Sequence, residues 1–200
     1  MEQEKNEKQL FNQKKAGKHL LVYLHDLVYL LCVILVIFLL LFRVVVVSGS
    51  SMKTTLVDGD YLLLLSSTFY TQPKQGDIIV ASKDSFENGD PIVKRVIATA
   101  GQTVDIDFDT GAVYVDGTVL EEAYISTPTT ASEGVEFPII VEDGCLFVMG
   151  DNRINSRDSR SPDIGLIDCR EVLGKAMFLF LPGTDKGTTS RDFSRIGGLS

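Results

Sequence analysis

The sequence predicts a mainly β protein, with a single antiparallel β domain preceded by one N-terminal transmembrane helix. Two observations predict it: a long apolar run near the N-terminus, and a series of short strand-like segments after residue 48 with no sustained 3.6-residue periodicity. The length of 200 residues allows one domain with an anchor and excludes a multidomain protein. A hydrophobic content of 44% with 23% charged residues is typical of folded rather than disordered chains.

The apolar run covers residues 27–47, which are 21 residues with Arg43 as the only charge. A helix needs roughly 20 apolar residues to cross the bilayer core, so this run is long enough, and Arg43 lies close enough to its end to reach the interface. We therefore assign residues 20–47 to a transmembrane anchor. The alternative is a cleavable signal peptide with Ser48 and Ser50 before the cut, although the run is longer than a typical signal-peptide core.

Charge predicts the orientation of this anchor. Residues 1–19 carry five lysines against three glutamates, and lysine-rich flanks stay on the cytoplasmic side. Residues 48–200 then face outward, with 13 Lys and Arg against 23 Asp and Glu. The overall net charge of −8 argues against a nucleic-acid partner, which requires a basic face. We expect a cytoplasmic segment at 1–19, an extracytoplasmic domain at 48–182 and a polar, loosely ordered tail at 183–200.

Histidine and cysteine narrow the possible chemistry. Both histidines, His19 and His25, precede the outer domain, so that domain has no histidine base or metal ligand. This argues against a metalloenzyme, and we expect no metal or organic cofactor. Cys145 and Cys169 are the only cysteines of the outer domain. Outside the cell they could form a disulfide or equally remain reduced core residues.

Turn signals divide the outer domain into short strands. The segment 112–120 is typical of a hairpin, because Asp116-Gly117 suits the two positive φ angles of a tight turn. Residues 121–144 are rich in Thr, Pro and Glu and are expected to form a long loop. The other expected strands are 60–65, 77–81, 92–98, 103–108, 145–149 and 172–180.

A lysine inside the apolar strand 92–98 is the first candidate for chemistry. Alternation along the strand places Lys94 and Arg95 on opposite faces, so both cannot easily reach water. Burial disfavours an ammonium ion and lowers the pKa of such a lysine below its ordinary value of about 10.4. A lysine made neutral in this way can act as a general base. The alternative is an edge strand on which Lys94 is solvated.

Two further segments carry candidate groups. Residues 47–56 follow the anchor directly and contain Ser51 among small hydroxyl residues, which offers a nucleophile but is equally typical of a juxtamembrane linker. Residues 148–160 form a strand that ends in a loop dense in Asp, Asn, Arg and Ser. Such a loop could orient a catalytic group, or it could be an ordinary solvated turn.

Taken together, these segments form an ordered set of motifs. The set consists of Ser51-Met52, Thr55-Leu56, Gly59-Asp60, Gly76-Asp77, Lys94-Arg95-Val96, Gly150-Asp151-Asn152-Arg153, Asn155-Ser156 and Asp158-Ser159-Arg160. In this order, the motifs resemble those of the bacterial type I signal peptidases, a family of Ser-Lys dyad proteases. The resemblance runs from the anchor to about residue 180, and the Gly-Asp-Asn-Arg motif is its most specific part.

The resemblance implies a membrane-anchored serine endopeptidase of the bacterial plasma membrane. Its partners would be the lipid bilayer and exported preproteins, from which it removes signal peptides after small residues at A-x-A-like sites. Ser51 would be the nucleophile and Lys94 the general base that takes its proton. The backbone N–H of Ser51 would supply one donor to the oxyanion.

The same resemblance implies supporting roles for five other residues. Ser156 would hydrogen-bond Lys94 and hold it in position. Asp151 would pair with Arg95, and Asp158 with Arg160, as structural ion pairs that steady the site.

Two positions depart from the family pattern. Thr54 stands where a proline is frequent, and Gly49 stands where some members have a serine as second oxyanion donor.

Two other functions compete with the protease. Residues 50–53 satisfy the S-x-x-K pattern of penicillin-binding enzymes, but the accompanying S-D-N and K-T-G elements are missing. The other is a catalytically silent anchored domain that binds a partner. Leu56, Val57 and residues 61–65 could form an apolar surface against lipid, or residues 61–65 could simply be a core strand.

Overall fold

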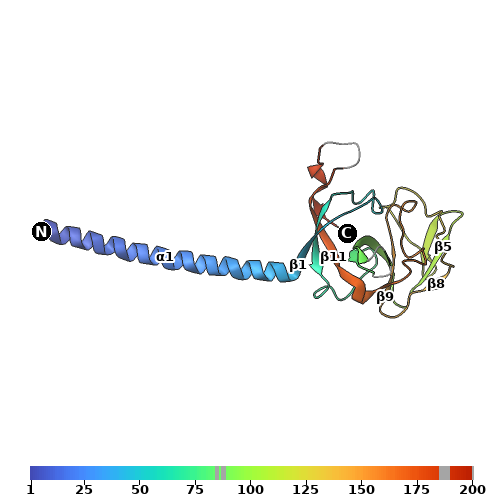
Figure 1. Ribbon diagram of the computed structural model, residues 1–200, viewed down its shortest axis with the longest axis horizontal. Coiled ribbons are helices and arrows are strands. Elements are labelled where there is room, and N and C mark those ends of the chain that lie inside the picture. Colours follow the sequence, from blue (N-terminus) through green and yellow to red (C-terminus); the bar gives the residue numbers. More distant parts are fainter. Residues whose placement is uncertain (84–85, 87–88, 185–189, 200) are drawn as a thin grey trace. The chain divides into compact units, whose positions relative to one another are not determined.

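The computed structural model describes residues 1–83, 86, 89–184 and 190–199, with the backbone alone for residues 2–18 and 20. It divides into two compact units, residues 1–41 and residues 42–200. The first unit is a single helix, α1 (Glu2–Leu41), shown in blue in Figure 1. Within it, Leu21–Leu41 has a mean hydropathy of 2.7, and none of this segment is buried. Its 21 residues are long enough to cross a bilayer core.

The helix ends at Leu41, six residues before the predicted end of the anchor at residue 47. Phe42–Val46 forms strand β1 instead, and pairs antiparallel with β2 (Tyr61–Ser66). Arg43 is therefore an exposed strand residue, not the last charge of a helix. The prediction was wrong here because hydropathy does not distinguish a helix from a strand, whereas the Phe and Val side chains favour a strand once a partner strand is available.

The second unit is built from two antiparallel sheets, which confirms the predicted fold class. The larger sheet has the strand order β1-β2-β11-β3-β4-β9-β10, with β12 paired to β11, and the smaller sheet has the order β7-β6-β5-β8. The remaining strands are β3 (Ile78–Ala81), β4 (Ile92–Thr99), β5 (Thr103–Asp107), β6 (Ala112–Val115), β7 (Thr118–Val119), β8 (Ile139–Ile140), β9 (Cys145–Met149), β10 (Ile167–Asp168), β11 (Val172–Leu181) and β12 (Gly197–Gly198).

The predicted strands all match elements of these sheets to within two residues at each end. The hairpin turn is also confirmed, since Asp116 and Gly117 have φ angles of 51° and 75°. Short strands without a clear alternation, β8, β10 and β12, were not predicted.

Strand β4 is a central strand, paired with β3 on one edge and β9 on the other. Its residues from Ile92 to Ala98 are all buried, so both of its faces are covered by core residues. Val93 packs in one core cluster with Leu62 and Leu64, while Val96 and Ile97 belong to two others. An edge strand with a solvated lysine is therefore excluded. The same clusters show that the β2 residues Leu62 and Leu64 are core residues.

The tail is attached to the domain, contrary to the prediction of loose order. Residues 193–195 form a 3₁₀ turn, and β12 then pairs with β11 opposite Phe178 and Leu179. The N–H of Leu199 donates to the Met177 carbonyl at 3.0 Å. Main-chain pairing of this kind leaves no signal in composition, which explains the error. Residues 185–189 and 200 lie outside the described residues.

The open question of a disulfide has a clear answer in this structure. Cys145 and Cys169 are both free. They pack against different core clusters, Cys145 against the one that contains Phe147 and Cys169 against the one that contains Leu146. Burial raises the pKa of both thiols, with a further contribution from the Asp168 carboxylate. Of the two alternatives, the structure therefore supports reduced, partly buried cysteines.

Candidate active site

Ser51 lies at the start of a single helical turn. The N–H of Lys53 donates to the Ser50 carbonyl at 3.1 Å, and the N–H of Leu56 donates to the Met52 carbonyl at 2.8 Å. Met52 and Leu56 are 1% and 0% exposed, so the turn is anchored in the core by its apolar residues. The Ser51 N–H donates no hydrogen bond within the described part of the chain. It is therefore available to a ligand, as the first N–H groups of a helical turn usually are.

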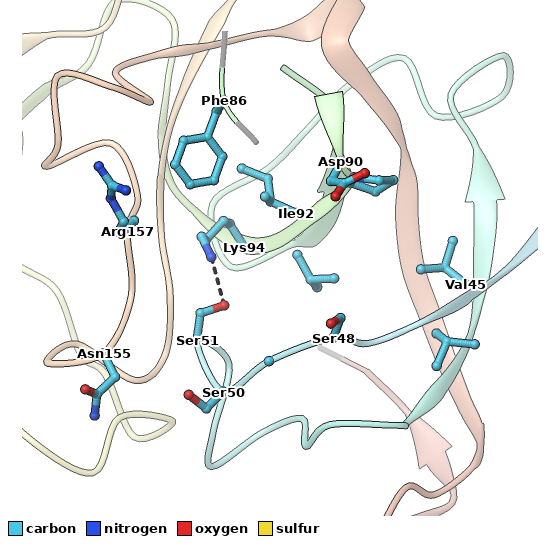
Figure 2. A pocket seen from close by; sticks show the side chains of 14 residues that line it. Val45, Ser48, Ser50, Ser51, Phe86, Asp90, Ile92, Lys94, Asn155 and Arg157 are labelled. Atoms are coloured by element: carbon cyan, nitrogen blue, oxygen red, sulfur yellow. Dashed lines mark hydrogen bonds between the residues drawn. The ribbon is translucent and has the colours of Figure 1, made fainter. Parts of the chain in front are cut away.

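The Lys94 Nζ donates a hydrogen bond to the Ser51 Oγ at 2.8 Å. Figure 2 shows this contact as the dashed line between the two side chains. Lys94 is 5% exposed, so its amine reaches the hydroxyl from inside the domain. The structure thus brings together the two residues that the sequence predicted as nucleophile and base, although 43 positions separate them.

The loop after β9 holds the Ser51 turn by its backbone. The N–H of Asn152 donates to the Ser51 carbonyl at 2.9 Å, and its side-chain Nδ2 donates to the Ser50 carbonyl at 3.0 Å. Gly150 is required for this approach, since a Cβ atom there would lie 2.4 Å from the Ser51 carbonyl oxygen. The Gly-Asp-Asn-Arg motif therefore holds the main chain of the turn that begins at Ser51, and is not the ordinary solvated turn considered from the sequence.

The predicted pair of Arg95 and Asp151 is present as a buried, two-pronged ion pair. Arg95 donates from Nε and Nη2 to the two Asp151 oxygens at 2.9 and 2.8 Å, and the side chains are 2% and 0% exposed. Arg95 also donates from Nη1 to the Gly76 carbonyl, and its guanidinium lies 4.0 Å from the centre of the Tyr124 ring. Asp151 accepts a further bond from the Thr55 hydroxyl, so the pair connects strand β4 to the Ser51 turn.

The second predicted pair is also present. Arg160 donates to the two oxygens of Asp158 at 2.8 and 2.9 Å, and both side chains are fully buried. Burial opposes the charge on Arg160, but hydrogen bonds and the charge of Asp158 outweigh it and raise the arginine pKa. Asp158 also accepts a bond from the Gly150 N–H at 2.9 Å. Nearby, burial and the Asp158 charge raise the pKa of Glu133, which pairs with Arg160 at 3.1 Å.

Ser156 does not have its predicted hydrogen bond to Lys94. Its hydroxyl is buried, lies against Gly150 and has no hydrogen-bond partner within the described part of the chain. The sequence could not give the direction of the Ser156 side chain, which packs against Gly150.

A cavity of about 500 Å³ opens beside Ser51 and Lys94. It lies between two chain segments, residues 45–51 and residues 90–94, with Asn155 and Arg157 on the side of Ser51 and Lys94 and Val45 on the opposite side (Figure 2). Its walls near Ser51 combine small residues with β-branched apolar ones. The lining residues are Val45, Val46, Ser48, Gly49, Ser50, Ser51, Phe86, Asp90, Pro91, Ile92, Val93, Lys94, Asn155 and Arg157.

The family model described as "Signal peptidase, peptidase S26" matches residues 20–181 of this chain. The chain belongs to the signal peptidase I family. It is 38% identical over 149 residues to a signal peptidase I of Bacillus licheniformis, which covers 70% of this chain and 77% of the relative. It is 35% identical over 190 residues to signal peptidase I T of Bacillus subtilis, which covers 91% of this chain and 96% of the relative.

A solved structure of a signal peptidase I from Enterococcus faecalis matches 52% of this chain and 97% of its own length, with 28% identity and a TM-score of 0.43. Signal peptidases I of this family are serine endopeptidases that cleave signal peptides, and this chain is an enzyme of that class.

Several residues that contact the predicted site residues were not themselves predicted. Tyr124, which stacks on Arg95, comes from the long segment 121–144. Glu133, which pairs with Arg160, comes from the same segment. These two contacts join residues 29 and 27 positions apart. No periodicity or spacing in a single sequence reveals them.

Proposed function

We propose that this chain cleaves signal peptides with a Ser51-Lys94 dyad. The observation that carries the proposal is the 2.8 Å hydrogen bond between a buried amine and the serine hydroxyl. Ser51 attacks the carbonyl carbon of the scissile bond while its proton passes to Lys94, and the Ser51 N–H stabilises the oxyanion. Lys94 then protonates the leaving amine, which gives an acyl-enzyme. Water deprotonated by Lys94 hydrolyses this ester and restores both residues.

Burial is the reason that Lys94 can serve as a base. With 5% exposure, the amine loses most of its hydration, and desolvation disfavours the ammonium form. The neighbouring cation, Arg95, is neutralised by Asp151 on the opposite face of the strand. We therefore expect a pKa below the ordinary lysine value of about 10.4. A base of this kind is matched to proton transfer from a serine hydroxyl.

The cavity supports cleavage after small residues. Near Ser51 its walls are formed by Ser48, Gly49 and the apolar side chains of Ile92 and Val93. Short apolar side chains of an extended substrate fit between such walls better than long or charged ones. This supports preproteins with A-x-A-like sites as the substrates.

The remaining parts of the proposal concern location. We propose that Leu21–Leu41 anchors the chain in the bacterial plasma membrane, with residues 1–19 in the cytoplasm and the β domain outside. The length and hydropathy of the helix support the anchor, and the lysines before it support the orientation. No nucleic-acid partner is proposed, because the chain is acidic.

The test is cleavage of a preprotein by the full-length chain in detergent, with mass spectrometry of the products. We expect one cut after a small residue, and no detectable cut by Ser51→Ala. The matched control is Ser48→Ala, which changes another serine of the same cavity and should cleave within about threefold of wild type. A wild-type chain that cuts no preprotein would contradict the proposal, as would a Ser51→Ala variant that cuts normally.

We further propose that one outer face of the large sheet contacts lipid. The register aligns Val44 of β1 with Leu63 of β2 and Phe178 of β11, and the rings of Tyr61 and Phe180 meet edge to face at 6.1 Å. Val44, Phe178 and Phe180 are exposed. From the sequence, residues 61–65 were either a lipid-facing surface or a core strand. Because Leu62 and Leu64 are buried, the proposed contact uses the exposed residues of the neighbouring strands β1 and β11.

Phe178→Asp should weaken this contact, because a carboxylate opposes entry of the face into the apolar part of the bilayer. We expect the kcat/KM for a preprotein in lipid vesicles to fall by roughly tenfold, with a soluble peptide still cleaved at the wild-type rate. Ile140→Asp is the control, since Ile140 is exposed on the other sheet. Equal losses on both substrates, or no loss on either, would refute the lipid contact.

A further inference from the structure

One arginine of the C-terminal tail, Arg195, contacts the turn that begins at Ser51. Arg195 Nη1 and Nη2 donate to the two oxygens of Asp60 at 2.9 and 2.6 Å. Nη2 also donates to the Thr55 carbonyl at 3.3 Å. These bonds join residues 135 and 140 positions apart, so the last residues of the chain fasten a segment that begins only a few residues after Ser51.

Asp60 is the buried acceptor of this contact. Its side chain is fully buried, and besides Arg195 it accepts bonds from the N–H groups of Val57 at 2.8 Å and Gly183 at 2.6 Å. Among the described residues, Asp60 therefore accepts hydrogen bonds from two main-chain N–H groups and from the Arg195 guanidinium. A buried carboxylate with these partners holds the end of the turn in one position.

Thr55 is held from two sides. Its hydroxyl donates to Asp151, the partner of Arg95, and its carbonyl accepts from Arg195. The turn that begins at Ser51 is thus tied at its far end both to the ion pair beside Lys94 and to the tail. The direction of the Ser51 N–H depends on this turn, because Lys53 and Leu56 close it by main-chain hydrogen bonds.

We propose that Arg195 is a positioning residue that sets the Ser51 N–H for oxyanion binding. The inference rests on the proposed dyad mechanism and adds to it a role for the tail. An oxyanion donor acts on the transition state and not on the bound substrate. Loss of the Arg195 contact should therefore lower kcat and leave KM nearly unchanged. Lys94 does not touch Arg195 or Asp60, so the pH at which activity is half-maximal should stay the same.

The experiment compares Arg195→Gln, Arg195→Lys and the paired variant Asp60→Asn with Arg195→Gln, using preprotein cleavage by the full-length chain in detergent. The paired variant leaves no unpaired buried charge, so it guards against simple unfolding. We expect kcat to fall by roughly ten- to a hundredfold in the Gln variants, with KM within twofold of wild type. Arg191→Ala is the control, since Arg191 donates to the Pro182 carbonyl and not to the turn. It should keep wild-type kcat.

Arg195→Lys separates positioning from a merely structural role. A lysine restores the positive charge beside Asp60 but cannot reproduce the planar set of bonds to Asp60 and Thr55. We expect it to restore the Tm more fully than kcat. Full recovery of kcat together with Tm, a change in KM alone, or a wild-type kcat in the folded paired variant would overturn the inference. If instead the wild-type chain cuts no preprotein, the dyad proposal fails first.

Discussion

Lys94→Met should lower preprotein cleavage by at least roughly a thousandfold while the domain remains folded. Methionine has nearly the length of lysine and fits the same buried space, but it cannot accept the Ser51 proton. Because a buried amine is costly to desolvate, an apolar side chain of similar volume should leave the Tm unchanged or higher. The measurement is the cleavage rate in detergent beside a thermal unfolding curve of the same preparation.

The matched control is Lys175→Met. Lys175 is a partly buried residue of β11 that pairs with Asp77, and it lies outside the cavity beside Ser51. We expect it to cleave within about threefold of wild type, with a modest loss of stability. Residual activity of Lys94→Met above a hundredth of wild type would count against Lys94 as the base. A collapse of the Tm in the same variant would mean that the lysine is needed for folding.

Of the proposed substitutions, Asp151→Ala should lower the free energy of unfolding most, because it leaves the buried Arg95 guanidinium without the Asp151 carboxylate. Breaking a buried ion pair costs roughly 3–5 kcal/mol, which in a domain of this size lowers the Tm by about 6–20 °C. The paired variant Arg95→Met with Asp151→Leu should recover most of that loss, since it removes both charges. Cleavage should stay low in the pair, because Thr55 has lost the oxygen that accepts its hydroxyl.

An exposed pair of the same composition provides the control. Arg170 and Asp168 also make a two-pronged contact, but Arg170 is 90% exposed. The Arg170 guanidinium lowers the pKa of Asp168 to about 2. Solvent weakens the contribution of such a pair to stability, so Arg170→Met should lower the Tm far less than Asp151→Ala does. Thermal or denaturant unfolding measures both cases, and equal costs for Asp151→Ala and Arg170→Met would contradict the account.

The strands of the domain could be predicted because their local signals agree with the fold. Strand β4 is an apolar run that is buried on both faces, and the hairpin at Asp116-Gly117 has the residues that its φ angles require. Strand β1 could not be predicted, because its apolar residues continue those of the helix without a turn signal. What decides its structure is pairing with β2, a partner that begins 15 residues later in the sequence.

The sequence predicted which residues gather at the candidate site, but only some of the contacts between them. Lys94 and Ser51 meet as expected, because strand β4 and the Ser51 turn carry them to one cavity. The Ser156 hydroxyl does not reach Lys94, since side-chain direction in a loop depends on packing against Gly150. The contact between Arg195 and Asp60 left no trace in the tail's polar composition, because it joins residues 135 positions apart.

The central claim is that Lys94 is neutral at the pH at which the enzyme works. A ¹³C NMR titration of lysine-labelled protein tests it most directly, with the Lys94 signal assigned from its absence in Lys94→Met. We predict that this signal titrates well below the ordinary lysine value of about 10.4, and that cleavage rises with pH through the same midpoint as the proton leaves. A Lys94 signal that titrates with the exposed lysines, while cleavage is already complete at lower pH, would contradict the mechanism.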